Sequence, residues 1–559
     1  MLDFAKKKEF WDNIRESDDY ARHRKEIKEK YDIAFSKEPA ILSYHSYTKD
    51  EPLENAWLAQ LFQLQSSAIL SLIYPDNEEY IRNLTKVIWV YCSEYSWAPV
   101  DHHNSYFNTT SQDYDPTMID IYAASIGFSL AEIKNLLGDR LPKLVRERMT
   151  AEIKRRIIDS FLERKFFWET HDNNWTAVCT GAVGGTFMYE APEEFKKIKH
   201  RFISAMEHYL GPYAEDGVCV EGAAYWGFGF GFFAVFASLL KEFTNGEDDL
   251  FKLPKVREIA AFIQKTFLDR NTMITFSDCN LREGYWIGLP HLLREIYGNV
   301  INKLPAEKGT IMEYHHFAFS LRSVIYYKKE YTARNKLKPV IYNLDKTGWF
   351  VKRCHAYGIA LKGGTNGESH NHNDVGSFIL SSGNKQILLD LGAGRYSQAY
   401  HGKERYTFFH PSSLSHNVPY FGDKAQDGQK REKVIISYDE ATETAKYEFA
   451  NAYGLDSVRK IDRSFKFYED SLVLTDEYDV DKGTPITERF VTREKPVTEG
   501  NSVILDNVRI TVESGATLSV DTVEAPMHSS NATETIYCLD YTLGEGVTQF
   551  KANIEILKY

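Results

Sequence analysis

Side chains that can carry out acid-base or metal chemistry gather in one short stretch, His370-Asn371-His372-Asn373-Asp374. An apolar run at 375–380, a turn at 382–384 and a second apolar run up to Asp390 follow it, so we expect a β-hairpin. His372 and Asp390 would then lie near each other at the open end of the hairpin. His416 is a third candidate ligand, because the sequence around it also changes from polar to apolar residues and could begin a neighbouring strand. Two imidazoles and a carboxylate suit zinc or a similar divalent ion. The alternative is that these side chains only hydrogen-bond across strand ends.

His370 stands two residues before His372, so alternation along an extended segment would place both on one face. One imidazole can then bind the ion while the other stays free to move protons near neutral pH, because its unperturbed pKa is about 6.5. The residues alone leave open which histidine does which.

Two stretches in the first half of the chain also hold unusual polar groups. The first is His171-Asp172-Asn173-Asn174-Trp175, just before an expected short helical turn at 175–180. A helix N-cap explains one of the asparagines but not the whole group. The second is 215–233, where glycines alternate with aromatics and Tyr225 and Trp226 stand near the start of a helix. For Tyr225 a packed core position is the alternative.

Apolar periodicity predicts two domains. Residues 1–320 show apolar side chains three and four apart, which predicts helices at 6–30, 53–73, 77–91, 118–137, 141–166, 192–210, 223–243, 254–267 and 288–297. Helices of similar length with short connections favour paired helices stacked into an incomplete (α/α) toroid. Residues 321–559 change to short alternating runs between turn signals, which is typical of an antiparallel β-sandwich. The fold class is therefore a multidomain α+β chain.

Composition narrows the possible partners and compartment. The net charge of -12 argues against binding to nucleic acid or to an anionic membrane. The 6 cysteines are scattered without a CxxC pair, so neither a zinc ribbon nor a disulfide framework is indicated. The N-terminus lacks an apolar signal region and no uninterrupted apolar stretch approaches a membrane span, so we expect a cytoplasmic protein. A trimmed signal would instead make it periplasmic or secreted.

Taken together, the stretches at 171–175, 221–225 and 370–374, with Asp390 and His416, resemble the heparinase II/III-like polysaccharide lyases. The resemblance covers nearly the whole chain. It implies a helical toroid and a β-sandwich that hold an acidic polysaccharide between them and cleave it by β-elimination at a uronic acid. One departure is Trp175, which follows the asparagine pair where some members have histidine, and this leaves the relative weight of His171 and Asn174 open.

The resemblance also implies roles for particular residues. Asn174 and His171 would neutralise the substrate carboxylate, Tyr225 would be the general acid and, as an alternative, also the base, and His370 would be the second proton-transfer residue. A divalent ion, usually zinc, would be held by His372, Asp390 and His416 and would brace the sandwich loop. These roles agree with the chemistry, because removing the proton next to a carboxylate requires donors that stabilise the developing charge. The expected substrate contacts are Trp175, Trp226, Arg395, Tyr396, Arg405 and His103.

The expected substrates are glycosaminoglycans: heparan sulfate or heparin, chondroitin sulfate and hyaluronan. Alternatives are an oligoalginate lyase, a cupin-like enzyme in which the metal itself does the chemistry, and a glycan-binding protein without catalysis. The oligomeric state stays open, a homodimer included.

Overall fold

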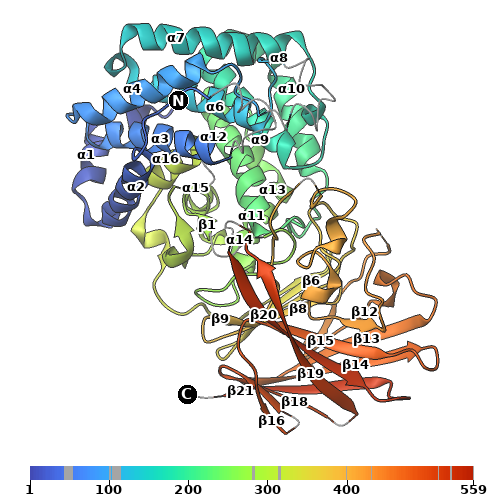
Figure 1. Ribbon diagram of the computed structural model, residues 1–559. Helices are drawn as coiled ribbons and strands as arrows, with labels where there is room; N and C mark the ends of the chain where they lie inside the picture. The colour runs from blue at the N-terminus through green and yellow to red at the C-terminus, as the bar shows by residue number, and fades with distance from the viewer. Residues whose placement is uncertain are drawn as a thin grey trace.

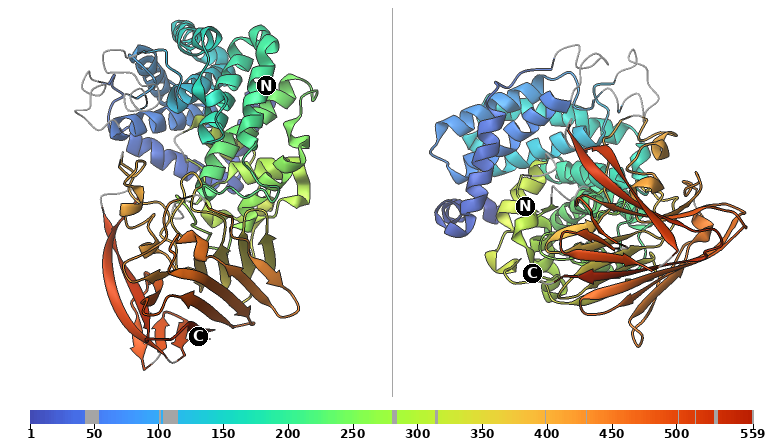
Figure 2. Two further views of the ribbon diagram at one scale, coloured as in Figure 1. Left: turned by 90° about the vertical axis from the view of Figure 1, so that its right-hand side faces the viewer. Right: turned by 60° about the horizontal axis from the view of Figure 1, so that its bottom comes forward.

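A helical domain precedes a β domain in this computed structural model, and the two are joined along one broad contact (Figure 1). The structure describes residues 1–42, 54–99, 102, 115–279, 284–312, 316–397, 399–429, 431–500, 502–513, 515–528 and 532–557, with side chains from residue 59 onward in the second range. The N-terminus lies among the helices and the C-terminus at the far side of the sandwich (Figure 2).

The helical domain is built from long helices joined by shorter ones. They are α1 (Lys8–Glu16), α2 (Ala21–Ala34), α3 (Glu54–Ile73), α4 (Glu78–Ser93), α6 (Ile121–Leu137), α7 (Lys143–Ile153), α8 (Ser160–Glu163), α9 (Asn174–Glu190), α10 (Pro192–Leu210), α11 (Ala223–Tyr225), α12 (Gly231–Phe243), α13 (Pro254–Ala260), α14 (Phe262–Lys265), α15 (Gly288–Tyr297) and α16 (Phe317–Ile325). The short strands β1 (Tyr285–Trp286), β2 (Leu304–Pro305) and β3 (Gly309–Thr310) lie between the last helices, and β4 (Thr332–Ala333) follows α16 and pairs with β2.

Helix α9 is the central helix of this domain, where the sequence predicted only a short turn. It packs against α6, α10 and α12. Its glycines permit close packing: a Cβ on Gly185 would lie 2.4 Å from the Phe128 ring and one on Gly184 2.6 Å from the Phe236 ring. The helix therefore continues because tertiary contacts outweigh the low helix propensity of glycine.

The segment Ala223–Phe243 is helical throughout, with a π-helical turn at Trp226–Phe230 between α11 and α12. It is long and apolar enough to cross a membrane by length and composition. However, 78% of its most apolar window is buried inside the protein, as in a core helix. The π turn belongs to the same helix whose first turn carries Tyr225.

The β domain contains β5 (Val340–Leu344), β6 (Trp349–Arg353), β7 (Gly358–Lys362), β8 (Phe378–Ser382), β9 (Lys385–Leu388), β10 (Pro419–Phe421), β11 (Ser437–Asp439), β12 (Thr444–Glu448), β13 (Val458–Phe467), β14 (Ser471–Val480), β15 (Ile486–Thr492), β16 (Val497–Glu499), β17 (Ser502–Leu505), β18 (Val508–Val512), β19 (Ala516–Pro526), β20 (Thr533–Leu543) and β21 (Gln549–Ile556). They form sheets in the orders β5-β6-β7-β8-β9, β11-β12-β13-β14-β21-β18-β17-β16 and β10-β15-β20-β19. Their neighbours pair antiparallel throughout, for example β7 with β8 and β14 with β21. The predicted antiparallel sandwich is confirmed.

The sheet β5–β9 joins the two domains because both of its faces are buried. Trp349, Val351, Ala360 and Ile379 belong to the core of the helical domain. The alternate positions Phe350, Ile359, Leu361, Phe378 and Leu380 belong to the sandwich core. This follows from the two-residue period of a strand, which points successive side chains to opposite faces. The ring of Trp349 packs edge-on to Phe276, with centroids 5.1 Å apart.

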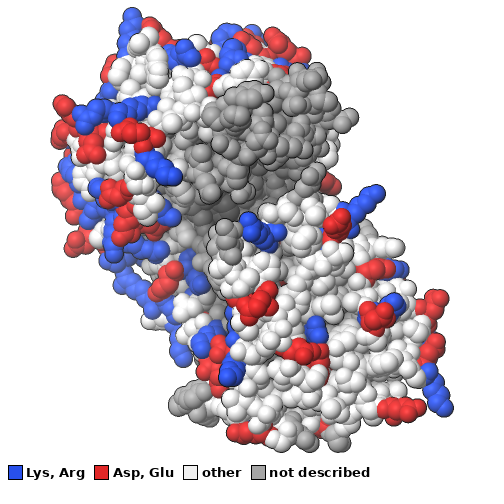
Figure 3. All heavy atoms as spheres, in the orientation of Figure 1, with Lys and Arg blue, Asp and Glu red and all other residues white. Residues whose placement is uncertain are grey.

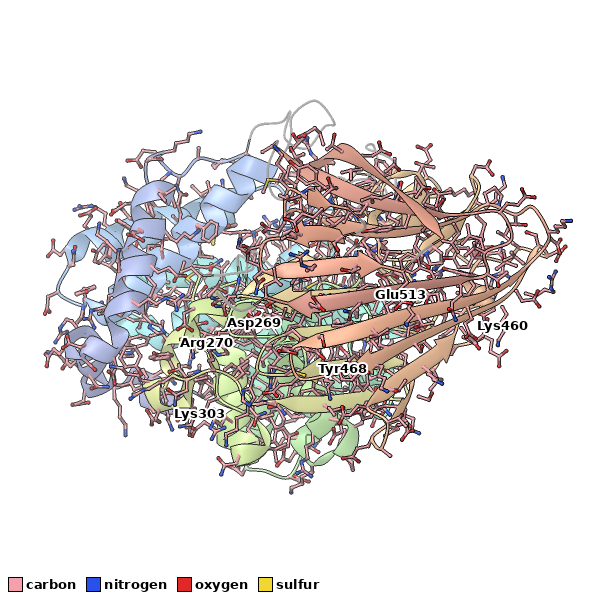
Figure 4. The ribbon with its side chains drawn as sticks, turned by 90° about the horizontal axis from the view of Figure 1, so that it is seen from below. Asp269, Arg270, Lys303, Lys460, Tyr468 and Glu513 are labelled. Atoms are coloured by element: carbon pink, nitrogen blue, oxygen red, sulfur yellow. The ribbon has the colours of Figure 1, made fainter. Side chains whose placement is uncertain are left out.

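Polar contacts at the border reinforce this joint. Figure 4 shows Asp269 and Arg270 where the helical domain meets the sheets, whereas Lys460 lies at the outer end of the sandwich. The carboxylate of Asp269 accepts hydrogen bonds from Thr272 Oγ1 at 2.6 Å and from Ser381 Oγ on β8. The domain boundary predicted at 320/321 falls within α16, and the helical domain continues to Ile325.

Candidate active site

Tyr225 and His370, from different domains, are in direct contact. Tyr225 ends α11, which follows a glycine with a φ of 106° at Gly222. The rings of Tyr225 and His370 are stacked, with centroids 4.1 Å apart and planes at 27°. The Tyr225 hydroxyl lies 3.0 Å from the Tyr396 hydroxyl. Burial, and then the charge of Asp278, raise the pKa of Tyr225 well above its ordinary value, so the phenol stays protonated.

His370 is not in an extended segment, which corrects the same-face prediction. Its φ is 54°, in the left-handed region that residues with a Cβ rarely adopt, and the chain around it forms turns. Such a conformation costs about 1 kcal/mol or more and persists where surrounding contacts enforce it. One such contact is the Asp278 N–H, which donates to the His370 carbonyl at 3.2 Å.

Asp278 accepts hydrogen bonds from both histidines. His370 Nδ1 lies 2.9 Å from Oδ2, and His372 Nε2 lies 3.1 Å from Oδ1. Tyr400 donates its hydroxyl to Oδ1 at 3.0 Å, and Arg405 Nη2 lies 2.9 Å from Oδ2. Burial alone would raise the pKa of Asp278, but the two histidine hydrogen bonds and the charge of Arg405 hold it well below its ordinary value. The ionised carboxylate can only accept, so both histidines donate their N–H to it.

A buried group that can hold a metal ion lies behind His370. His372, Asp374, Asp390 and His416 each offer one ligand atom, and these atoms lie within 4.8 Å of one another. His372 Nδ1 is buried without a hydrogen-bond partner. Asp390 Oδ2 and His416 Nδ1 are also buried, and they lie 3.2 Å from each other as an ion-pair contact. Three polar atoms that converge in a buried space with so few partners suit a cation.

The tautomers of the two histidines support this fit. His372 donates Nε2–H to Asp278, and His416 places Nε2 3.0 Å from the His410 carbonyl. In both rings Nε2 therefore carries a proton and Nδ1 faces the metal group, as in metal-binding histidines oriented by an outer hydrogen bond, and His416 Nδ1 lies 3.2 Å from Asp390 Oδ2. Asp374 differs, because Lys362 Nζ contacts both of its oxygens at 2.7 and 2.8 Å. The three predicted ligands thus come together, and Asp374 is already neutralised by a lysine.

The helical side contributes a cavity of about 290 Å³ next to Tyr225. Asn174, the first residue of α9, and Glu221 line it from the helical domain, and Glu368 and Ser369 line it from the sandwich. Asn173 caps α9 by accepting the Trp175 N–H at 3.1 Å, which fixes the direction of Asn174. Asn174 Nδ2 lies 3.3 Å from Glu221 Oε2, so this amide donates one N–H to a carboxylate and keeps a second.

Several predicted substrate contacts lie elsewhere. Trp226 is 1% exposed and donates its indole N–H to the Ile259 carbonyl, so it is a core residue and that prediction is wrong. Arg405 is held by Asp278 and by the Asn371 carbonyl, at 3.0 Å from Nε, so it supports the site instead of facing a ligand. Trp175 is buried, with its ring 5.5 Å from that of Phe167.

The other predicted contacts occupy the surface or fall outside the described part of the chain. Arg395 is exposed, and its neighbour Tyr396 reaches Tyr225. His171 is exposed and packs edge-on to Phe167, one residue before Asp172, which lines the cavity. His103 lies outside the described residues.

Asp278 and Tyr400 were missed by the sequence interpretation. Asp278 follows an apolar stretch at 273–276 and Tyr400 stands in a loop, and neither position has a recognisable spacing to the histidines. A buried acid of this kind can be identified only from its contact with residues about 90 positions away along the chain, such as His370. Glu221 lies in the stretch 221–225 that carries the family resemblance, but the sequence predicted no catalytic or binding role for it.

Comparisons with known proteins agree with the two-domain fold described above. Residues 339–549 match the model of the family described as Heparinase II/III-like, C-terminal. A crystal structure of heparinase III is similar with a TM-score of 0.61 and 15% identity, over 89% of this chain and 76% of that one. The heparan sulfate lyase HepC of Pedobacter heparinus has a TM-score of 0.58 and 13% identity, over 99% of this chain and 93% of that one. The chondroitin AC lyase of Streptomyces coelicolor A3, in complex with chondroitin sulphate, has a TM-score of 0.57 and 12% identity, over 99% of this chain and 82% of that one. The chain has no match among curated protein sequences.

Proposed function

We propose that this chain, whose C-terminal domain belongs to the heparinase II/III-like family and whose two domains together have the heparinase III fold, is a polysaccharide lyase. It acts by β-elimination on glycosaminoglycans that contain uronic acid. The observation that carries the proposal is the contact between Tyr225 and His370, which unites a protonated phenol and an imidazole at one site.

The hydrogen bonds around His370 support its role as the base. Its Nδ1–H is donated to Asp278 Oδ2 at 2.9 Å, so the neutral ring keeps a lone pair on Nε2. This nitrogen can accept the proton on the carbon next to the uronate carboxyl group. The charge that develops there requires donors, and the second N–H of Asn174, which lines the cavity, is the available candidate. We also propose His171, which precedes the lining residue Asp172 in the chain, as a donor to the substrate carboxylate.

Tyr225 supplies the acid. As the bond from the sugar carbon to the leaving glycosidic oxygen breaks, the phenol gives its proton to that oxygen, and the electron pair of the broken C–H bond forms the new double bond. The Tyr396 hydroxyl, 3.0 Å away, can donate to the phenolate that remains. The products are a shortened chain and an unsaturated uronic acid, and no water is consumed.

Zinc is the ion we propose for the group of His372, Asp390 and His416, since two imidazoles and one carboxylate are ligands that zinc accepts. When bound, it would supply positive charge that fixes these three side chains. The chemistry of the elimination is carried by the protein residues at the cavity.

Basic groups near the site support an acidic substrate. A second cavity, of about 390 Å³, is lined by the basic residues Lys308, Lys385, Arg493 and His528. Glu494 and Glu534 also line it and pair with Lys385 and Arg493, so Lys308 and His528 are the basic groups without an acidic partner among the lining residues. The ring of His528 packs edge-on to that of Tyr396, with centroids 4.6 Å apart, so this cavity adjoins the phenol pair. Figure 3 shows Lys and Arg interspersed with Asp and Glu along the left margin, down to the junction of the domains. Basic groups at a cavity can attract a polyanion locally even though the whole chain is acidic.

The test is to incubate the protein with heparan sulfate, chondroitin sulfate, hyaluronan and alginate and to follow the ultraviolet absorbance of unsaturated uronates. We expect product from at least one glycosaminoglycan. Product from alginate alone would identify an oligoalginate lyase. Binding without product would identify a glycan-binding protein, and turnover that stops at once on chelation, without an unsaturated product, would identify a metal-centred enzyme. Each of the three would refute the proposed function.

A further inference from the structure

Asp278 connects two sites that the sequence interpretation treated as separate. Its Oδ2 accepts from His370, the proposed base, and its Oδ1 accepts from His372, a ligand of the metal group. Each oxygen also has one further donor: Arg405 Nη2 at Oδ2, 2.9 Å away, and the Tyr400 hydroxyl at Oδ1, 3.0 Å away. One planar group thus spans the distance between the metal group and the imidazole stacked on Tyr225.

The backbone around the histidines is held by the same residues. The Asp278 N–H donates to the His370 carbonyl at 3.2 Å, and Arg405 donates from Nε and Nη2 to the Asn371 carbonyl, each at 3.0 Å. The left-handed φ of His370 is kept by contacts that converge on Asp278. If His372 moved, the carboxylate plane would turn, and the hydrogen bond that directs His370 would turn with it.

The domain origin of these residues adds to the argument. Asp278 lies in the helical domain, between α14 and β1, whereas His370 and His372 lie in the loop before β8. The imidazole in contact with Tyr225 is therefore oriented across the domain border, by a carboxylate whose other oxygen is engaged by a metal ligand. Outer partners of metal-binding histidines set both ring orientation and metal affinity.

We propose that Asp278 is the positioning residue through which the metal group orients His370 for proton transfer. The proposal rests on the proposed function and on the metal group described above. It departs from the expectation that the ion only braces the sandwich loop, because metal binding and turnover become coupled through one side chain.

The experiment compares Asp278→Asn with Asp216→Asn as the matched control. Asp216 is also a carboxylate of the helical domain that reaches the sandwich, accepting Thr347 N–H and Oγ1, each at 2.7 Å. Zinc affinity is measured by chelator competition without substrate, and kcat and KM are measured by the absorbance of unsaturated uronate. For Asp278→Asn we expect zinc affinity to fall about tenfold or more and kcat about 100-fold, with KM within about threefold. Asp216→Asn should change none of these by more than about threefold.

Tyr400→Phe is a second variant in case Asp278→Asn loses its thermal unfolding transition. It removes the donor that shares Oδ1 with His372, and zinc affinity and kcat should then fall together by several fold. Unchanged zinc affinity in a folded Asp278→Asn variant would overturn the proposal, and so would normal kcat or a loss confined to KM. If the wild type forms no unsaturated product, the proposed function fails, yet normal zinc affinity in Asp278→Asn would still refute the link to the metal group on its own.

Discussion

Replacing Tyr225 with phenylalanine removes one oxygen atom from the site and is the sharpest test of the proposed chemistry. The ring remains and can keep its stacking on His370, where the centroids are 4.1 Å apart. Only the hydroxyl is lost, and with it the hydrogen bond to the Tyr396 hydroxyl at 3.0 Å. The variant therefore separates packing from proton donation.

The two expected effects differ greatly in size. A hydrogen bond between two neutral hydroxyls contributes about 1 kcal/mol to the free energy of unfolding, so stability should change by about that amount. Loss of the general acid should lower kcat about 100-fold to 10,000-fold, which corresponds to about 3–5 kcal/mol in the activation free energy. The phenylalanine at position 225 has no proton to give to the leaving oxygen, so this step loses its acid.

Tyr209→Phe is the matched control. Tyr209 lines the same cavity, and its hydroxyl lies 2.7 Å from that of Tyr213, so this variant also loses one hydroxyl from a pair of tyrosines. Both variants are assayed for unsaturated uronate and for thermal unfolding. A Tyr225→Phe variant with more than about a third of the normal rate would refute the reasoning, as would an equal loss of rate in Tyr209→Phe.

Three further predictions concern the metal group, the buried histidine of α2 and the ionic cluster of the sandwich. Excess zinc at about 100 times its dissociation constant should stabilise the metal-free wild type by about 2.7 kcal/mol and leave His416→Ala unchanged, as measured by thermal unfolding. Burial lowers the pKa of His23 to about 3, below its unfolded value of about 6.5, so the unfolded state binds more protons and stability falls as the pH falls below 6.5. At pH 5 the protonation of His23 in the unfolded state lowers the free energy of unfolding by about 2 kcal/mol. In denaturant unfolding, His23→Phe should therefore lose less stability than the wild type between pH 7 and pH 5, by about this amount. Arg463→Met should destabilise the sandwich by about 3–5 kcal/mol in denaturant unfolding, because it removes the guanidinium that pairs with the buried acids Asp476 and Glu488.

Each of these has a clear contrary result. Equal stabilisation of His416→Ala by zinc would place the ion elsewhere. An unchanged pH dependence in His23→Phe would mean that another group is responsible for the acid sensitivity. An Arg463→Met variant as stable as the wild type would show that the cluster can be replaced by apolar packing.

The three candidate metal ligands could be predicted from the sequence, because their residue types suit a divalent ion and the family resemblance singles out their positions. His372, Asp390 and His416 stand beside apolar runs that become strands or follow them, and the structure brings them together. The two-domain order was equally readable, since helical and strand periods differ. Tyr225 and His370 were predicted as a pair through the family resemblance, and their contact is now observed, although their roles stay predictions.

The remaining features depend on contacts that no local pattern encodes. The length of helix α9 was underestimated, because the close packing that its glycines permit is evident only when the facing rings are known. The turn at His370 was read as extended because the Asp278 N–H that holds its carbonyl comes from the other domain. Trp226 was placed at the substrate because aromatic residues near a site are indistinguishable in sequence from those in a core.

The sheet that lies between the two domains also limits how a substrate can enter. Side chains on one of its faces pack in the core of the helical domain, and those on the other face pack in the core of the sandwich. The two domains therefore cannot separate by a hinge motion without exposing buried apolar side chains to water. Under the proposed function, a polysaccharide therefore reaches the cavity beside Tyr225 without separation of the two cores, and we expect the shape of the free protein to change little when a polymer binds.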